Sequence, residues 1–180
     1  MTDRDPIPGY DKLLDDLVVN RLARGLHGRL IRPGDDDYER ARQVWARMVD
    51  RRPALIARCA DREDVTAAIK FARECDLRVA VRSGGHSSYG TCDGGLVIDL
   101  TMMKQVEVDS TNRLARADAG LTSGELDTAT SLYGMAVPLG ECPTTGIGGV
   151  TLGGGIGYLL GRHGLTCDNL NGGGADRCQW

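Results

Sequence analysis

Residues 78–90 read RVAVRSGGHSSYG, and this stretch decides the fold. Its first part, RVAVR (78–82), has the alternating apolar residues of a short β-strand. A glycine-rich loop with one histidine, His86, follows the strand directly. Glycine lets a backbone approach a ligand closely, and successive inward-facing amides can cradle an anion such as a pyrophosphate. The stretch therefore predicts a strand that ends in an anion-binding loop.

The residues on both sides of this stretch predict a partly parallel β-sheet. Before it, ALIARC (54–59) is a short apolar run typical of a strand, and Asp61 is placed to cap a helix over 62–76. Strand, helix and strand span about 30 residues, the size of a right-handed crossover between parallel strands. After it, GLVIDL (95–100) predicts a further strand. We expect Asp64 to act in a variant capping box, and the inner helix face to hold Val65, Ala68, Ile69 and Ala72.

More helices and a hairpin are predicted towards the two ends of the chain. Apolar residues at helical spacing predict helices over 11–26 and 38–49. Two short runs, VEVD and RLARAD (105–109 and 113–118), predict a β-hairpin, and a helix is predicted over 122–133. The residues expected to face inward are Leu13, Leu14, Leu17, Val18 and Leu22, then Tyr38, Ala41, Trp45 and Met48, and finally Leu121 and Leu126.

Composition and charge limit the classes of partner. Glycine accounts for 25 of the 180 residues, about twice the usual share, and most of it lies between Gly84 and Gly174. The formal charge of −3 provides no positive field of the kind that attracts nucleic acid. No run of 18 apolar residues occurs, and the first residues lack the pattern of a signal peptide. We therefore expect no nucleic-acid or membrane partner and a cytoplasmic location.

The common nucleotide, hydrolase and zinc signatures are missing from the sequence. No lysine follows a glycine, as a P-loop requires, and the glycines between 146 and 157 do not keep the G-x-G-x-x-G spacing. Neither G-x-S-x-G nor H-E-x-x-H occurs. The six cysteines form no C-x-x-C pair, so we predict no metal site.

A second glycine-rich segment, GECPTTGIGGVTLGGGIGYLLGRHG, covers residues 140–164. Pro143 stiffens the chain directly after Cys142. A lone cysteine is most often a small buried residue, and a lone loop histidine is most often structural. Taken singly, Cys142 and His86 therefore leave a purely structural role open. Close approach of the backbone to a flat ligand is predicted at Gly146, Gly148 and Gly149.

The two segments together resemble the FAD-binding domain of the vanillyl-alcohol oxidase / p-cresol methylhydroxylase (PCMH) superfamily, and above all its berberine-bridge-enzyme-like branch. RRPALIARC (51–59), VWARMVDRRPA (44–54) and GRHGLTCDNL (161–170) match the same family. The resemblance implies FAD as cofactor, linked through His86 to the 8α-methyl carbon and through Cys142 to C6 of the flavin. The cofactor-binding residues that it implies are Arg82, Ser83, Gly84, Gly85, His86, Ser87, Cys142, Gly146, Gly148 and Gly149.

The implied double attachment makes chemical demands on these residues. It needs a neutral imidazole nitrogen and a thiolate, both nucleophilic towards an electron-poor ring. A thiol beside cationic groups or many backbone amides has a lowered pKa, which favours the thiolate. Arg82 is suited either to an ion pair at the end of its strand or to a contact with the flavin, and the sequence leaves both open.

The fold class implied is α+β: a PCMH-type FAD-binding domain with a β-α-β unit, a mixed sheet and an incomplete second subdomain. We expect a helical lead-in over 1–50 and the FAD-binding domain over 51–180, with an atypical tail at 171–180. Members of this family are much longer, so we expect a C-terminally truncated chain that lacks the substrate domain.

The function implied is oxidation of an alcohol, sugar or amine-type small molecule by hydride transfer to flavin N5. No catalytic base can be assigned, and whether this chain acts as an enzyme by itself stays open. The alternatives are a truncated, non-catalytic flavin-binding remnant and an unrelated structural domain whose glycines serve only turns.

Overall fold

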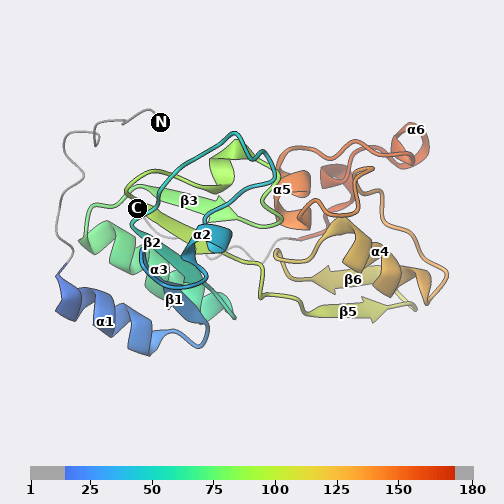
Figure 1. The fold of residues 1–180 in the computed structure, drawn as a ribbon. Helices are drawn as coiled ribbons and strands as arrows, with labels where there is room; N and C mark the ends of the chain where they lie inside the picture. Colours follow the sequence, from blue (N-terminus) through green and yellow to red (C-terminus); the bar gives the residue numbers. More distant parts are fainter. Residues whose placement is uncertain (1–14, 173–180) are drawn as a thin grey trace. The chain divides into compact units, whose positions relative to one another are not determined.

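The computed structural model describes residues 15–172, which form parts of two compact units, one up to Met103 and one from Lys104 onward (Figure 1). The predicted inward residues Leu13 and Leu14, and residues 173–180 of the predicted tail, lie outside the described residues. The boundary expected at residue 51 stays a prediction. Between residues 15 and 172, no helix is long and apolar enough to cross a lipid bilayer.

The first unit contains a four-stranded mixed sheet in the order β1-β2-β4-β3. Strand β1 runs antiparallel to β2, whereas β2 and β3 each run parallel to β4. The predicted α+β class with a mixed sheet is confirmed, but β4 lies between the two strands of the predicted crossover. Strand β1, with only three residues, was not predicted. The strands are β1 (Arg29–Ile31), β2 (Leu55–Arg58), β3 (Val79–Arg82) and β4 (Leu96–Asp99).

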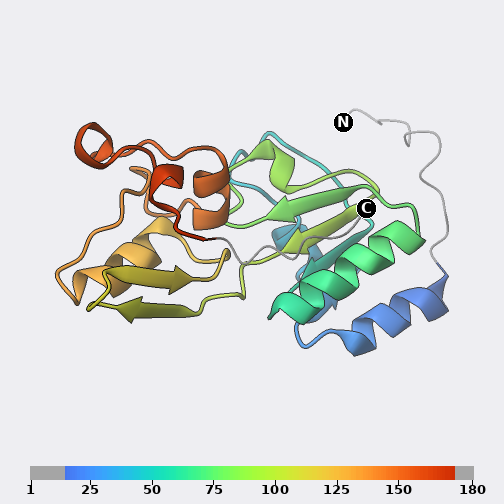
Figure 2. The same ribbon diagram turned by 180° about the vertical axis from the view of Figure 1, so that it is seen from behind.

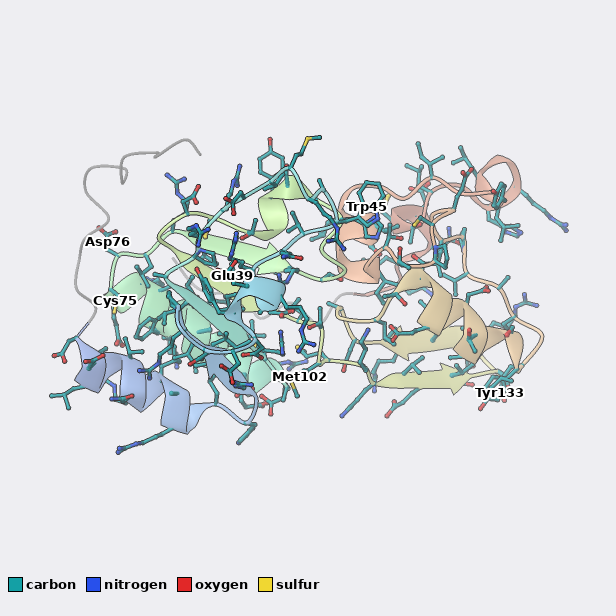
Figure 3. The ribbon with its side chains drawn as sticks, in the orientation of Figure 1. Glu39, Trp45, Cys75, Asp76, Met102 and Tyr133 are labelled. Carbon is teal, nitrogen blue, oxygen red and sulfur yellow. The ribbon has the colours of Figure 1, made fainter. Side chains whose placement is uncertain are left out.

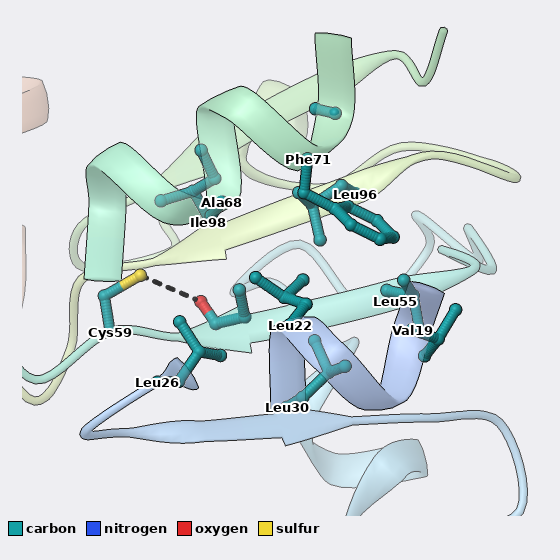
Figure 4. Close-up of a cluster of buried hydrophobic side chains, with 12 residues drawn as sticks. Val19, Leu22, Leu26, Leu30, Leu55, Cys59, Ala68, Phe71, Leu96 and Ile98 are labelled. Carbon is teal, nitrogen blue, oxygen red and sulfur yellow. Dashed lines mark hydrogen bonds between the residues drawn. The ribbon is translucent and has the colours of Figure 1, made fainter. Parts of the chain in front are cut away.

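Apolar side chains cover both faces of this sheet. Helices α1 (Asp16–Gly25) and α3 (Arg62–Glu74) pack on one face (Figure 2), and a smaller cluster that includes Tyr38 covers the other. Burial on both faces explains why β2 and β4 read as continuous apolar runs instead of alternating ones. The larger cluster, drawn in Figure 4, comprises Val19, Leu22, Leu26, Leu30, Leu55, Ala57, Cys59, Ala68, Phe71, Ala72, Leu96 and Ile98.

Helix α3 begins where the sequence predicts, but one of its acidic residues has a different role. The Asp61 side chain accepts a hydrogen bond from the N–H of Asp64 and caps the helix. Asp64 itself is buried, and its carboxylate accepts three backbone N–H groups, from His27, Gly28 and Ala60, at 2.8 to 2.9 Å. The carboxylate therefore joins the start of α3 to the chain before β1 instead of completing a capping box.

Two predictions near the N-terminal end of the first unit are wrong. The helix predicted over 38–49 is confined to α2 (Tyr38–Ala41), and beyond it Trp45 and Met48 are 72% and 93% exposed. Leu17, expected to face inward, is 77% exposed, because α1 turns Val19 and Leu22 towards the core. Helical spacing alone does not say which of two neighbouring apolar rows is buried.

The second unit joins a β-hairpin to short helices. Strands β5 (Val106–Asp109) and β6 (Leu114–Ala117) form the predicted antiparallel hairpin. Helix α4 (Ser123–Ser131) follows, with a capping box between Thr122 and Glu125. The expected inward residues Leu121 and Leu126 are buried together with Ile147. The remaining elements are α5 (Ile147–Leu152), α6 (Leu160–His163) and the 3₁₀ turns η1 (Ser88–Gly90), in the first unit, and η2 (Cys167–Asn169).

Candidate functional site

The loop that carries His86 leaves the sheet at a row of charged residues. Arg58, Asp99 and Arg82 lie side by side in register at the carboxyl ends of β2, β4 and β3. The Asp99 carboxylate accepts hydrogen bonds from Arg82 at 2.7 Å and from Arg58 at 3.2 Å. Asp99 and Arg82 are both buried, so the network ties the end of β3 firmly to its neighbours.

Asp99 stays ionised in this network. Burial by itself raises the pKa of Asp99, but the charge and hydrogen bond of Arg82, together with hydrogen bonds from Thr101, more than offset this effect. The pKa of Asp99 therefore lies below its usual value. The structure places Arg82 in the strand-end ion pair, one of the two roles that the sequence left open for it.

The segment after β3 turns sharply and presents His86. Gly85 has a positive φ of 72°, a conformation that side-chain-bearing residues rarely adopt. The Ser87 side chain accepts the N–H of Tyr89 and caps η1, which ends the loop. His86 is half-buried, as are Ser83, Gly84 and Gly85, and Ser87 is exposed.

An aromatic residue far away in the sequence meets this loop. The rings of Trp45 and His86 are stacked, with centroids 5.5 Å apart and planes 13° from parallel. The backbone N–H of Trp45 also donates a hydrogen bond to the carbonyl of Gly85 at 2.8 Å. Trp45 is labelled in Figure 3, on the connection between α2 and β2.

Cys142 is an exposed thiol on the second glycine-rich segment. Its Sγ lies 3.3 Å from the hydroxyl oxygen of Thr144. Hydrogen bonds from the Thr144 side chain, and from the backbone N–H groups of Thr144 and Thr145, lower the pKa of Cys142 because they stabilise the thiolate. By contrast, burial raises the pKa of Cys59 to about 12, so that thiol stays protonated and inert.

The start of helix α4 anchors the Cys142 segment. Two N–H groups in the first turn of α4, those of Ser123 and Gly124, donate to the carbonyls of Thr145 and Pro143 at 2.8 and 2.9 Å. Gly124 leaves little room for a side chain, since a Cβ there would come within 3.0 Å of Pro143. Gly146 is buried directly before α5, Gly148 is half-buried, and Gly149 is exposed with open space where a side chain would point.

Glycines farther along the segment serve packing inside the chain. A Cβ at Gly157 would lie 1.8 Å from the carbonyl oxygen of Leu139, and one at Gly155 would lie 2.1 Å from the Thr166 hydroxyl oxygen. The buried Thr166 hydroxyl donates to the Pro138 carbonyl at 2.6 Å. These glycines allow the backbone to approach itself, so they need no ligand to explain them.

One acidic cluster has the composition of a cation site. Ligand atoms of His27, Asp61 and Asp64 lie within 4.8 Å of one another. The hydrogen bond and charge of Asp61 raise the pKa of His27. Both Asp64 oxygens already accept backbone N–H groups, and Asp61 caps α3, so the cluster is explained as the helix cap.

The predicted site residues fall into two groups. Arg82 to Ser87 form one continuous stretch in the first unit, and Cys142 to Gly149 form another in the second. Sequence reasoning missed the ionic partners Asp99 and Arg58, which only the pairing of the strands brings to Arg82. It also missed the stacking of Trp45, which was assigned to a helix core. Thr144, the hydrogen-bond partner of Cys142, could have been found from the sequence, because it stands inside the C-P-T-T-G motif.

Comparisons with known proteins agree with this arrangement. Residues 53–173 match the family described as FAD binding domain. The chain is 39% identical over 156 residues to an FAD-linked oxidoreductase of Dictyostelium discoideum, covering 86% of this chain and 34% of the relative. It is 36% identical over 159 residues to (R)-6-hydroxynicotine oxidase of Paenarthrobacter nicotinovorans, covering 86% and 35%. The chain thus spans about a third of the length of the curated relatives it matches.

Solved structures show the same likeness. The wild-type berberine-bridge-enzyme-like protein 1 of Physcomitrella patens matches with a TM-score of 0.79 and 32% identity, over 85% of this chain and 34% of that one. The xylooligosaccharide oxidase of Myceliophthora thermophila C1 matches with a TM-score of 0.74 and 30% identity, over 84% and 33%. On this evidence of sequence and fold, the chain belongs to the FAD-binding domain family of berberine-bridge-enzyme-like, FAD-linked oxidoreductases, within the PCMH superfamily.

Proposed function

We propose that this chain is the flavin-binding part of an oxidoreductase in which FAD is linked covalently to both His86 and Cys142. The observation that supports the proposal is the presence of one accessible nucleophile in each of the two motifs. His86 offers a half-buried imidazole on the loop after β3, and Cys142 offers an exposed thiol of lowered pKa.

The chemistry of both loops suits FAD. The turn at Gly85, with its positive φ, lets neighbouring backbone amides of residues 83–87 face an anion such as the pyrophosphate. In the proposal, Arg82 holds this loop through Asp99 instead of pairing with phosphate. Around Cys142, open space at Gly149 leaves room for a flat ring to approach the backbone.

When bound, FAD would supply the hydride acceptor: its N5 atom would take the hydride that leaves a substrate carbon. In each attachment, one protein N–H or S–H bond and one flavin C–H bond are replaced by a single C–N or C–S bond. Dioxygen takes up the two protons and two electrons that this releases, and becomes hydrogen peroxide. Thr144 assists by holding Cys142 closer to its thiolate form, and His86 reacts through a neutral ring nitrogen.

The substrate class that we propose is an alcohol, a sugar or an amine-type small molecule. Two of the similar proteins are named for 6-hydroxynicotine and for xylooligosaccharide, which are small molecules of these kinds. We assign no catalytic base among residues 15–172. Cytoplasmic location and the absence of nucleic-acid partners stay predictions. The alternative is a flavin-binding remnant without turnover.

Intact mass after expression with ample riboflavin tests the attachment. The wild-type chain should gain the mass of one FAD and stay yellow after acid denaturation. His86→Ala and Cys142→Ser should each keep one link and therefore the full mass gain, whereas the double variant should lose it. Cys167→Ser is a matched control, because Cys167 is also a partly accessible thiol in the second unit. This control should behave as wild type.

Other outcomes separate the competing functions. An unshifted wild-type mass in spite of ample riboflavin would contradict both links. A flavin-loaded protein that no alcohol, sugar or amine reduces would favour the remnant over the enzyme. If the double variant holds the same ligand as wild type, the motifs are not the binding site.

A further inference from the structure

Trp45 lies where a helix was expected, and it touches the candidate nucleophile of the first unit. Its indole stacks on the imidazole of His86 with ring centroids 5.5 Å apart and nearly parallel planes, and its backbone N–H donates to the Gly85 carbonyl. We propose that Trp45 is a positioning residue that sets the plane of the His86 ring for attachment to FAD. The inference rests on the function proposed above and names a residue outside both motifs.

The segment that carries Trp45 is built to hold it in place. Arg42, only 9% exposed, donates two hydrogen bonds to Glu39 at 2.6 and 2.9 Å, one to Asp50, and one to the Arg51 carbonyl at 3.1 Å. These bonds draw the two ends of the segment 42–51 together, so that residues 43–50 form a closed strap. Because of these hydrogen bonds, the strap has one defined backbone conformation although it is not helical.

The strap is also tied to the charge row under the His86 loop. Arg82 donates to the carbonyl of Gln43 at 3.2 Å while its other guanidinium nitrogen bonds Asp99. Gly85 and Gly90 lie next to the side chain of Arg82. An added Cβ would lie 3.4 Å from this side chain at Gly85 and 3.7 Å from it at Gly90. Arg82 therefore supports both the loop that carries His86 and the strap that carries Trp45. This shared support keeps the distance between the two rings fixed.

Core burial does not explain this placement of a tryptophan. Trp45 is 72% exposed, so most of its ring surface gains nothing from removal from water. The contact that is made is the stack itself, and an offset aromatic pair has an attractive energy beyond its buried area. The Trp45 ring is mostly exposed to solvent, hydrogen bonds hold the strap that carries it, and one face of the ring lies on the candidate nucleophile His86. This combination indicates a role for Trp45 at His86.

The role follows from the geometry of attack by an imidazole. Formation of the C–N bond requires the lone pair of one ring nitrogen to point at the methyl carbon, and this lone pair lies in the ring plane. Two side-chain torsions set the plane, and a stacked indole restricts both of them. Loss of the stack removes this restraint on the ring plane, so attachment at His86 slows while attachment at Cys142 is unchanged.

The test measures attachment at the two residues separately. Apoprotein is incubated aerobically with FAD, and peptides that contain His86 or Cys142 are quantified over time by mass spectrometry. Trp45→Leu should slow the appearance of the His86-linked peptide by roughly three- to tenfold, the rate equivalent of one aromatic pair, and leave the Cys142-linked peptide at the wild-type rate. Trp45→Phe should restore most of the rate, because it keeps an aromatic face.

A second measurement needs no flavin. The chain has three histidines, so the ring protons of His86 can be assigned in NMR spectra with a His86→Gln variant. They should show an upfield ring-current shift in the wild-type apoprotein and lose it in Trp45→Leu. Met48→Ala, which changes a 93% exposed residue of the same strap, is the control and should leave the shift and both rates unchanged.

The outcomes keep the two proposals apart. If wild type links FAD at Cys142 and His86, but Trp45→Leu loses the ring-current shift without slowing His86, the positioning role is wrong and the proposed function stands. A wild-type apoprotein without the shift also overturns the positioning role. If neither peptide of the wild type ever carries flavin, the proposed function fails and the inference falls with it. Circular dichroism of Trp45→Leu, with Trp45→Phe as the second variant, separates these outcomes from unfolding.

Discussion

The loop of His86 and the loop of Cys142 are expected to do the same job, but they are held by different forces. The His86 loop leaves three aligned strand ends, where a buried carboxylate and two guanidinium groups meet. The Cys142 loop is held by backbone hydrogen bonds from the first turn of α4, close to the surface. The sheet therefore fixes where the His86 loop begins, whereas the immediate neighbours of Cys142 set its reactivity.

The contrast extends to the two units. The first unit uses buried charge to join its strands, and removal of one charge leaves another without compensation. The second unit packs Gly155 and Gly157 against its own hydroxyl and carbonyl groups, where an added side chain collides, as it does at Gly28 and Gly95 in the first unit. The charge row of the first unit is thus sensitive to changes of charge, and these glycines of the second unit are sensitive to changes of volume. Three substitutions test this difference.

The largest effect is expected from Asp99→Asn in the first unit. The change keeps the shape of the side chain but leaves Arg82 buried without its carboxylate, and we expect a loss of about 3 to 5 kcal/mol of unfolding free energy. Urea unfolding measures the loss, and hydrogen exchange should show faster exchange at residues 83–90. Glu107→Gln, which removes an exposed pairing with Arg116, is the control and should cost less than about 1 kcal/mol.

The same substitution predicts a change in the pH dependence of stability. Because the folded-state pKa of Asp99 is lowered, its contribution is complete above the unfolded value of about 3.9 and disappears as the pH falls towards the folded-state pKa. Wild type should therefore lose stability more steeply than Asp99→Asn below about pH 4. Equal acid sensitivity of the two proteins would show that the network contributes little.

The second substitution, Gly155→Ala, probes the volume limit of the second unit. Gly155 has a φ of 77°, and the added Cβ would lie 2.1 Å from the Thr166 hydroxyl oxygen. Backbone strain and the collision together should cost about 3 kcal/mol. Gly161→Ala adds the same methyl group in open space on α6 and should be neutral or slightly stabilising. Similar melting temperatures for the two variants would refute the volume argument.

The smallest effect on stability, but a clear one on reactivity, is expected from Thr144→Val. Without the hydroxyl, the pKa of Cys142 should rise towards the ordinary thiol value, because a hydrogen bond to the thiolate is lost. Iodoacetamide should then modify Cys142 more slowly at neutral pH, and the rate should reach its plateau at a higher pH. Peptide mass spectrometry measures both, with buried Cys59 as the unreactive reference. An unchanged pH profile would mean that the backbone N–H groups alone set the reactivity.

Local patterns in the sequence predicted much of this fold, and pairing between distant segments accounts for most of what they missed. The strands β2, β3 and β4, the cap at Asp61 and the hairpin follow from period and turn residues. The position of β4 between β2 and β3 does not, because strand order depends on contacts that no local period records.

The strap shows why a helical pattern failed. Residues 38–49 have apolar spacing for a helix, yet the buried Arg42 binds Asp50 and the Arg51 carbonyl, and Trp45 contacts the Gly85 carbonyl and the His86 ring. These tertiary bonds outweigh a weak local preference. In the same way, Asp64 has the spacing of a capping-box residue but accepts three backbone N–H groups, two of which, from His27 and Gly28, come from a distant part of the chain. The residues of the two motifs could be proposed from the sequence because they are contiguous, and their partners were missed because they are not.

The exposed thiol has a consequence for handling the protein. Sulfur oxidation proceeds through the thiolate, so an accessible cysteine of lowered pKa is the first to form sulfenic acid and then irreversible sulfinic acid. Among the cysteines in residues 15–172, Cys142 is the one that combines both properties. Preparations left in air without a reductant should therefore age at this sulfur first, while Cys59 stays intact in the core.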